Sequence, residues 1–218
     1  MPVTSKAPDE WIDGFLFVGN HLALDFLNTR PVLAEGAKEL LPDMEALVRW
    51  LVASDLLTRQ QAKALARKWS RTPQAAVFLR GLLKFREQLR AMVVRLEAGF
   101  SVSTAFIAEL NSLLKQHPSI IALQRKGEKL DVDAAFEPEK PNDVWAPIAT
   151  AVAELLSDVS PERLRKCESC VVHFFDTSKK NSRRWCSMNI CGNKIKVAAY
   201  QQRKRAARKS QRAKRNRT

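Results

Sequence analysis

The sequence lacks several features that would assign the protein to a common functional class. No stretch approaches 18 consecutive apolar residues, which excludes a membrane-spanning helix. The N-terminus has neither the basic start nor the apolar stretch of a secretory signal, so we expect a soluble cytoplasmic protein with no membrane partner. The chain also lacks a glycine-rich phosphate loop, a G-x-S-x-G or HExxH motif, and any Cys/His pair outside one cysteine cluster. We therefore expect no enzymatic activity.

Acidic residues are scarce at one end of the chain. The segment 161–218 carries 18 of the 37 basic residues and three of the 23 acidic residues, a net charge of +15. The remaining residues have a net charge of −1. A basic segment attached to a nearly neutral body is typical of a polyanion-binding protein, so we expect a nucleic-acid partner, with duplex DNA favoured. A solvated charge run is the simpler alternative.

Residues 1–159 have the pattern of a helical domain. Apolar residues make up 45% of the 218-residue chain, enough for one ordinary domain plus a small appendage. Apolar periodicity and capping signals predict a buried first segment followed by further helices, at 21–29, 43–53, 58–69, 72–98, 103–114 and 142–156. Alternating apolar residues on either side of Lys126-Gly127 predict one β-hairpin. Ser160-Pro161 marks a boundary, so we expect a mainly α protein with a helical domain at 1–159 and a small module at 160–218.

All four cysteines of the chain lie within 25 residues, at Cys167, Cys170, Cys186 and Cys191. The spacings C-x2-C and C-x4-C can direct four thiolates at one centre, about 2.3 Å from a zinc ion. A disulfide pair or a thioredoxin-type redox site is the weaker interpretation, because a cytosolic chain keeps its thiols reduced and a redox motif has no second spaced pair. Four protein ligands leave no position for a catalytic water, so we expect a structural Zn²⁺ whose binding drives the module to fold.

The residues between the cysteine pairs predict a β-hairpin in the zinc module. Apolar residues alternate through 171–175, and Thr177–Ser182 is rich in turn-forming residues. His173 lies in the first of these strands. It could replace a cysteine as a ligand, but we favour a half-exposed strand residue.

Beyond the last cysteine the chain has no proline, and its pattern predicts a basic helix over 194–215. Alanine and isoleucine share one side and basic residues cover the other. Such a helix would be about 33 Å long, close to one turn of duplex DNA. Donors that the zinc fold holds in place can discriminate between base edges, whereas mobile ones cannot. The expected nucleic-acid contacts are Arg183, Arg184, Asn193, Lys194, Lys196, Arg203, Lys204, Arg205 and Arg208.

The pattern C-x2-C…C-x4-C-G-N-K, followed by a basic helix, resembles the CGNR-type zinc finger. The N-terminal stretch GNHLALDFLNT, Gly19–Thr29, is similar to the opening motif of the ABATE domain, the helical domain that precedes this finger in bacterial proteins. Together the two resemblances cover nearly the whole chain. They imply a bacterial, stress-related transcription regulator that binds DNA through its basic finger. Lys194 stands where the family name has arginine, which keeps the charge but loses the planar bidentate fork.

Polar residues inside the apolar N-terminal motif need partners. Through the resemblance, Asp25, Asn28 and Thr29 belong to the shared motif, and Arg86 is a candidate partner for Asp25 or for an anionic ligand. Two interpretations stay open here: an effector site, or a buried network of caps and salt bridges that holds the first helix.

The sequence as a whole predicts a zinc-dependent, DNA-binding transcription regulator. Its helical body is expected to sense a small-molecule effector or to form a homodimer. The alternative is an RNA- or ribosome-associated protein, because charge alone does not distinguish duplex DNA from RNA.

Overall fold

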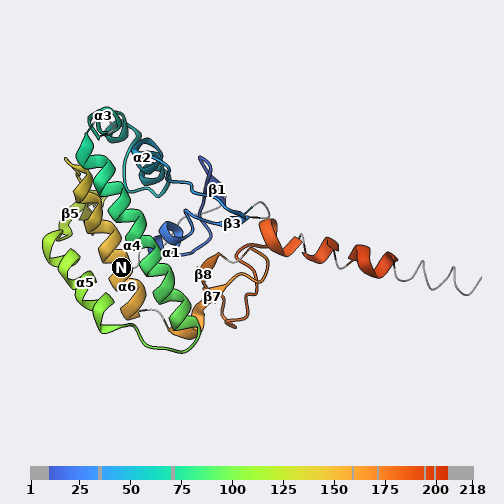
Figure 1. Cartoon of the computed structure of the whole chain (residues 1–218). Helices are drawn as coiled ribbons and strands as arrows, with labels where there is room; N and C mark the ends of the chain where they lie inside the picture. The colour runs from blue at the N-terminus through green and yellow to red at the C-terminus, as the bar shows by residue number, and fades with distance from the viewer. Residues whose placement is uncertain are drawn as a thin grey trace, which may run out of the picture.

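The computed structural model in Figure 1 describes residues 10–33, 36–69, 72–158, 160–170, 172–193, 195–198 and 200–205. Helices dominate this part of the chain, and its strands form two-stranded antiparallel ribbons, which confirms the expected mainly α class. In chain order the elements are β1 (Trp11–Ile12), β2 (Phe15–Leu16), α1 (Leu22–Leu27), β3 (Val32–Leu33), β4 (Gly36–Ala37), α2 (Met44–Ala53), α3 (Arg59–Trp69), α4 (Pro73–Glu97), α5 (Thr104–Gln116), β5 (Ile120–Lys126), β6 (Lys129–Ala135), α6 (Trp145–Asp158), β7 (Leu164–Lys166) and β8 (His173–Phe175).

The helices begin at the capping residues that the sequence indicates. The side chains of Asp43, Thr72 and Ser103 each accept a hydrogen bond from the backbone N–H three residues later, at 2.8, 3.2 and 3.3 Å. Thr58 and Gln61 cap each other's backbone N–H groups at the start of α3. These local contacts satisfy N–H groups that a helix end leaves unpaired. Helix α6, the last of the body, begins after a 3-10 turn, three residues later than predicted.

The first helix lies at the centre of the body. All six residues of α1 are buried, and the helix packs against α4 and α6. Two aromatic contacts extend this core, with 5.8 Å between the ring centroids of Phe26 and Trp50 and 5.3 Å between those of Phe85 and Trp145. Because α1 has no exposed face, its polar residues must find partners within the protein.

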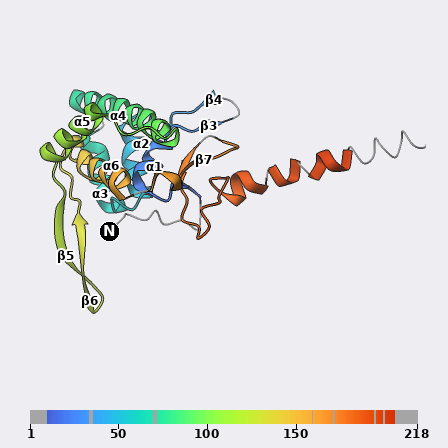
Figure 2. The ribbon, with the colours of Figure 1, turned by 90° about the horizontal axis from the view of Figure 1, so that it is seen from below.

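The predicted hairpin of the body is present as β5 and β6. Its register pairs Ile120 with Ala135 and Leu123 with Val132, and Gly127, with φ 64°, opens the two-residue turn. Figure 2 shows that this hairpin projects away from the helices of the body.

The zinc module contains a hairpin, but not the one predicted from sequence. The expected strands on either side of Thr177–Ser182 are wrong, because β8 pairs instead with β7, on the other side of the C-x2-C turn. Asp176 explains the difference: its carboxylate accepts hydrogen bonds from the backbone N–H groups of Ser178 and Arg183, both at 2.8 Å, and so closes the segment between them into a compact loop.

Residues 195–198 and 200–205 are helical and extend away from the body (Figures 1 and 2). They form the first part of the basic helix predicted over 194–215; Lys194 and residues 206–218 lie outside the described residues. Within the described ranges, no helix combines the length and the apolar character needed to cross a membrane.

Candidate zinc centre and nucleic-acid interface

The four cysteine sulfurs converge on one point. Their Sγ atoms all lie within 4.8 Å of one another, with 3.5 Å between Cys170 and Cys186 and 3.7 Å between Cys186 and Cys191. Sulfurs bound tetrahedrally at about 2.3 Å from a zinc ion would lie about 3.8 Å apart, so the cluster has the right size for Zn²⁺. None of the four is in a disulfide, and Cys167, Cys186 and Cys191 are buried. The predicted clustering of the four cysteines, in an arrangement able to bind zinc, is confirmed.

The contacts between the thiols explain why the site needs a cation. Hydrogen bonds from Cys170 and Cys186 lower the pKa of Cys167 well below its usual range. The contact with Cys167 raises the pKa of Cys170 to about 12 and also raises the pKa of Cys186. The thiolate of Cys167 is therefore favoured, while Cys170 and Cys186 hold their protons more tightly. A bound Zn²⁺ stabilises all four thiolates together, and its binding releases the remaining protons.

Residues from both ends of the chain enclose the metal centre. Leu16 and Val18, from the N-terminal segment, pack with Phe174 around the cysteines. Ser187 donates a hydrogen bond to the carboxylate of Glu10. The module is therefore completed by residues that precede α1, and it does not fold on itself alone.

The N-terminal motif also binds strand β8 through hydrogen bonds. The side-chain amide of Asn28 donates to the backbone oxygen of His173 at 2.8 Å and accepts from its backbone N–H at 3.1 Å. Phe175 donates its N–H to the backbone oxygen of Gly19 at 2.8 Å, and its own oxygen accepts from the amide of Asn20 at 2.9 Å. These four bonds join the motif to the zinc module across about 150 residues of sequence.

His173 is buried, with 3% of its surface exposed, so the expectation of a half-exposed strand residue is wrong. The Nε2 atom of its ring lies 3.2 Å from Oε2 of Glu97, the last residue of α4. His173 is not part of the cysteine cluster. No local sequence signal marked Glu97 as its partner, because the two residues are 76 positions apart.

The other polar residues of the motif have partners within the body. Asp25 accepts a hydrogen bond from the N–H of Gly19 at 2.7 Å, and a side chain at Gly19 would clash with Asp25, which explains the glycine. Arg86 is 1% exposed; it donates to Thr29 at 2.9 Å and forms two bonds to the carboxylate of Glu39, at 2.9 and 2.5 Å. Burial alone would raise the pKa of Glu39, but the hydrogen bonds from Arg86 and from the backbone of Leu41, together with the charges of Arg86 and Arg30, outweigh it, and the pKa is lowered. Glu39 thus neutralises the charge of Arg86, and the sequence analysis did not predict this pairing.

The two arginines before Cys186 have different surroundings. The guanidinium of Arg183 lies 4.7 Å from the ring centroid of Phe174 and donates to the backbone oxygen of Cys186, so it stabilises the metal-binding loop from within. Arg184 is 64% exposed and forms a two-point ion pair with Glu168, at 2.8 and 2.6 Å. An exposed ion pair is weak, so Arg184 can exchange its partner for another anion.

The remaining residues predicted to contact nucleic acid follow Cys191 in the chain, and the described ones lie on a helix. Their side chains are exposed where the structure describes them, at Asn193, Lys196, Arg203, Lys204 and Arg205. Lys194 and Arg208 lie outside the described residues.

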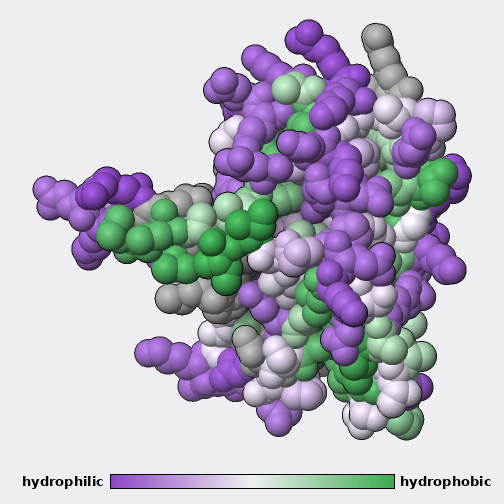
Figure 3. All heavy atoms as spheres, turned by 90° about the vertical axis from the view of Figure 1, so that its left-hand side faces the viewer, coloured by the Kyte–Doolittle hydropathy of each residue, from purple (hydrophilic) through white to green (hydrophobic). Residues whose placement is uncertain are grey.

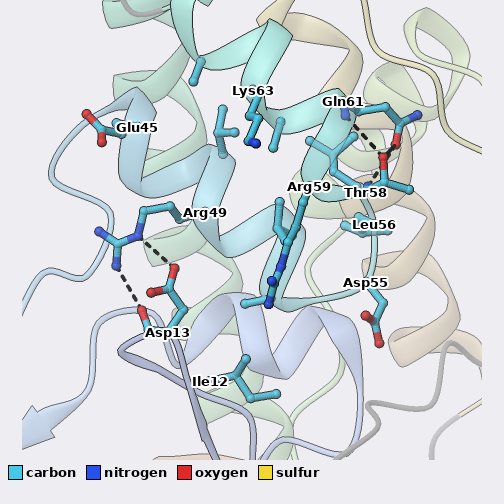
Figure 4. A pocket seen from close by; sticks show the side chains of 16 residues that line it. Ile12, Asp13, Glu45, Arg49, Asp55, Leu56, Thr58, Arg59, Gln61 and Lys63 are labelled. Atoms are coloured by element: carbon cyan, nitrogen blue, oxygen red, sulfur yellow. Dashed lines mark hydrogen bonds and ion pairs between the residues drawn. The ribbon is translucent and has the colours of Figure 1, made fainter.

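A groove of about 940 Å³ lies between α2 and α3 (Figure 4). Val48 and Val52 contribute apolar lining, and Arg49 is held at one side by Asp13, with 2.9 Å between Nε and Oδ2. Arg59 and Lys63, one turn apart on α3, line the groove and are exposed. No sequence motif indicated this groove, because its lining combines residues 12 and 13 with one face each of α2 and α3.

A helical body bonded to a four-cysteine module with a projecting basic helix defines a zinc-finger protein. Residues 20–159 match the family ABATE, described as "Putative stress-induced transcription regulator", and residues 163–204 match the CGNR zinc finger. The chain therefore belongs to the ABATE family and carries a CGNR zinc finger, as the sequence resemblance implied. Both descriptions are of a regulator or zinc-finger type and not of an enzyme. No curated protein matches the chain.

Proposed function

We propose that this protein is a transcription regulator that binds duplex DNA through its zinc module and basic helix. The observation that carries the proposal is the position of that helix. It follows directly on the zinc ligand Cys191 and extends from the body with Lys196, Lys204 and Arg205 exposed. Because zinc holds the first turn, the basic residues have a defined direction relative to the body, as a helix needs in order to enter a DNA groove.

The exposed residues of the zinc module and the basic helix would have two roles in DNA binding. Residues 203–205 and the basic residues beyond them neutralise phosphates, which gives affinity for any sequence. Arg184 and Asn193 lie beside zinc ligands and are exposed, so they are the candidates for reading base edges. Residues 1–159 act as a separate functional unit that holds the module of 160–218 and regulates it. The zinc site is structural in this proposal, since four protein ligands leave no position for a catalytic water.

Selection of bound sequences from a random duplex pool, with structured RNA as competitor, tests this function. We expect enrichment of a shared duplex sequence that excess RNA does not displace. If RNA displaces DNA at equal concentration, the RNA- or ribosome-associated alternative replaces the proposal. If no sequence is enriched, the protein is a general nucleic-acid binder.

We propose the α2–α3 groove as the effector site, for a small molecule with an apolar body and one acidic group. Val48 and Val52 would contact the apolar part, and Arg59 and Lys63 would hold the anion. Asp13, Glu45 and Asp55 also line the groove, so the anion is expected on the α3 side, because the eleven residues of α3 include four bases and no acid. Arg86 is less suited to the role, since Glu39 already neutralises it.

Octanoate is a suitable probe for this site. We expect Arg59→Glu combined with Lys63→Glu to weaken its binding about 100-fold, because each charged contact contributes about tenfold. Arg67→Glu, on the same helix but outside the groove lining, is the matched control and should bind normally. Calorimetry on the full chain measures the effect. Equal affinity in the double variant and the wild type would exclude the groove as the site.

A further inference from the structure

One face of the β5–β6 hairpin is apolar and uncovered. Ile121, Leu123, Leu130 and Val132 are 70, 64, 59 and 60% exposed. The register places Leu123 opposite Val132 and Arg125 opposite Leu130, so these four apolar side chains share one face. Figure 3 shows the projecting arm with a continuous hydrophobic surface along its length and a hydrophilic end.

Among the described residues, the hydrogen bonds between the body and this hairpin segment lie near its base. There, Ser119 bonds to the hydroxyl of Thr150 at 2.7 Å and to the backbone oxygen of Ala146 at 3.4 Å. Farther out the two strands project from the helices, as Figure 2 shows. A two-stranded ribbon is marginally stable on its own in water, and an apolar patch of this kind on a soluble protein marks an interaction site. The hairpin therefore lacks the partner that its apolar face requires.

The charge of the hairpin favours a second copy of this chain as that partner. Residues 120–135 contain three basic and three acidic residues, so the arm is neutral, in contrast to the +15 segment 161–218. A nucleic acid would need a positive surface, which this arm does not offer. Two neutral arms do not repel each other. In a two-fold contact, the apolar face of one copy covers the same face of the other copy.

The size of the patch is compatible with a dimer of moderate affinity. Four side chains, each about two-thirds exposed, amount to an apolar patch of a few hundred Å² on each copy, against the roughly 800 Å² that each partner buries in a standard interface. Antiparallel packing is favoured because it keeps the Arg125 side chains, which lie toward the tip of the apolar face, apart.

We propose that two copies of this protein form a symmetric dimer by packing the apolar faces of their β5–β6 hairpins against each other. The hairpin and the basic helix project in different directions from the body (Figure 2), so both zinc modules stay accessible in the dimer. Such a dimer presents two basic helices, the arrangement with which regulators contact paired half-sites. The dimer does not depend on DNA binding, and its formation is measured without nucleic acid.

Sedimentation equilibrium of the full, zinc-loaded chain tests the proposal. We expect a dimer for the wild type, and a dissociation constant raised about 100-fold or more by Leu123→Lys, because a symmetric dimer carries the substitution twice. Val77→Lys, at a residue of α4 that is 61% exposed, is the matched control and should remain dimeric. Zinc content and helicity confirm that each variant is folded.

A second variant excludes a folding defect as the cause. Replacing residues 121–134 by a short glycine-serine turn joins positions that are already neighbours in the ribbon, and it should give a folded, zinc-loaded monomer. A wild type that is monomeric at 100-fold the concentration used for DNA binding would overturn the proposal. Dimers of unchanged affinity in both hairpin variants would overturn it as well. Neither result bears on whether the zinc module binds DNA.

Discussion

Cys186→Ser is expected to abolish zinc binding and to unfold the zinc module, from β7 to the start of the basic helix. Zinc binding contributes on the order of 10–16 kcal/mol in small zinc-finger peptides, which is at least as large as the stability of most whole domains. The module has only a small apolar cluster of its own, around the cysteines, so nothing else can replace the metal. Elemental analysis should give one zinc per wild-type chain and none for the variant.

Hydrogen exchange locates the effect along the chain. Exchange should become fast through residues 164–193 and around Leu16 and Val18, which pack against the cysteines. Helices α2 to α6 should stay protected, because their core does not include the metal centre. Ser169→Ala, between the first two ligands, is the matched control and should keep its zinc. Full zinc content in Cys186→Ser, or loss of protection throughout the body, would contradict this account of the site.

Truncation after Tyr200 is expected to weaken DNA binding by about 10³-fold at 50 mM salt. If the full chain neutralises about six phosphates, its log–log salt slope is near −5, and its affinity falls about 10³-fold between 50 and 200 mM salt. The truncation removes nine of the 18 basic residues in 161–218. Losing about three phosphate contacts then flattens the slope to near −3. Fluorescence anisotropy across a salt series measures both quantities.

Substitutions within the folded part separate affinity from sequence preference. Replacing Arg67 and Lys68 of α3 by glutamine removes two charges from the body, outside the groove lining, and should leave the salt slope unchanged. Arg184→Ala should cost about 1–3 kcal/mol on the preferred sequence and less on random DNA. Arg183→Ala should instead destabilise the module, because its guanidinium packs on Phe174. Equal losses on both kinds of DNA for Arg184→Ala would mean that the zinc module contacts only phosphate.

The sequence by itself determined the features that depend on neighbouring residues. Asp43, Thr72 and Ser103 mark helix starts because each caps a backbone N–H only three residues away. The β5–β6 hairpin follows from alternating apolar residues around a glycine turn. The zinc site follows from cysteine spacing, because a C-x2-C turn brings two thiolates together whatever surrounds it.

Only the tertiary structure decided the roles of the polar residues and the pairing in the zinc module. Asn28 binds His173, 145 positions away, and Arg86 binds Glu39, 47 positions away. A buried polar group must be paired, but the amino-acid sequence does not identify the distant residue that forms the hydrogen bond. Strand β8 is a second example. Its composition predicts a strand, but the Asp176 loop and the hydrogen bonds to the N-terminal motif determine which strand pairs with it. Helix caps and metal spacings are local, whereas buried pairs and strand partners depend on how distant segments pack.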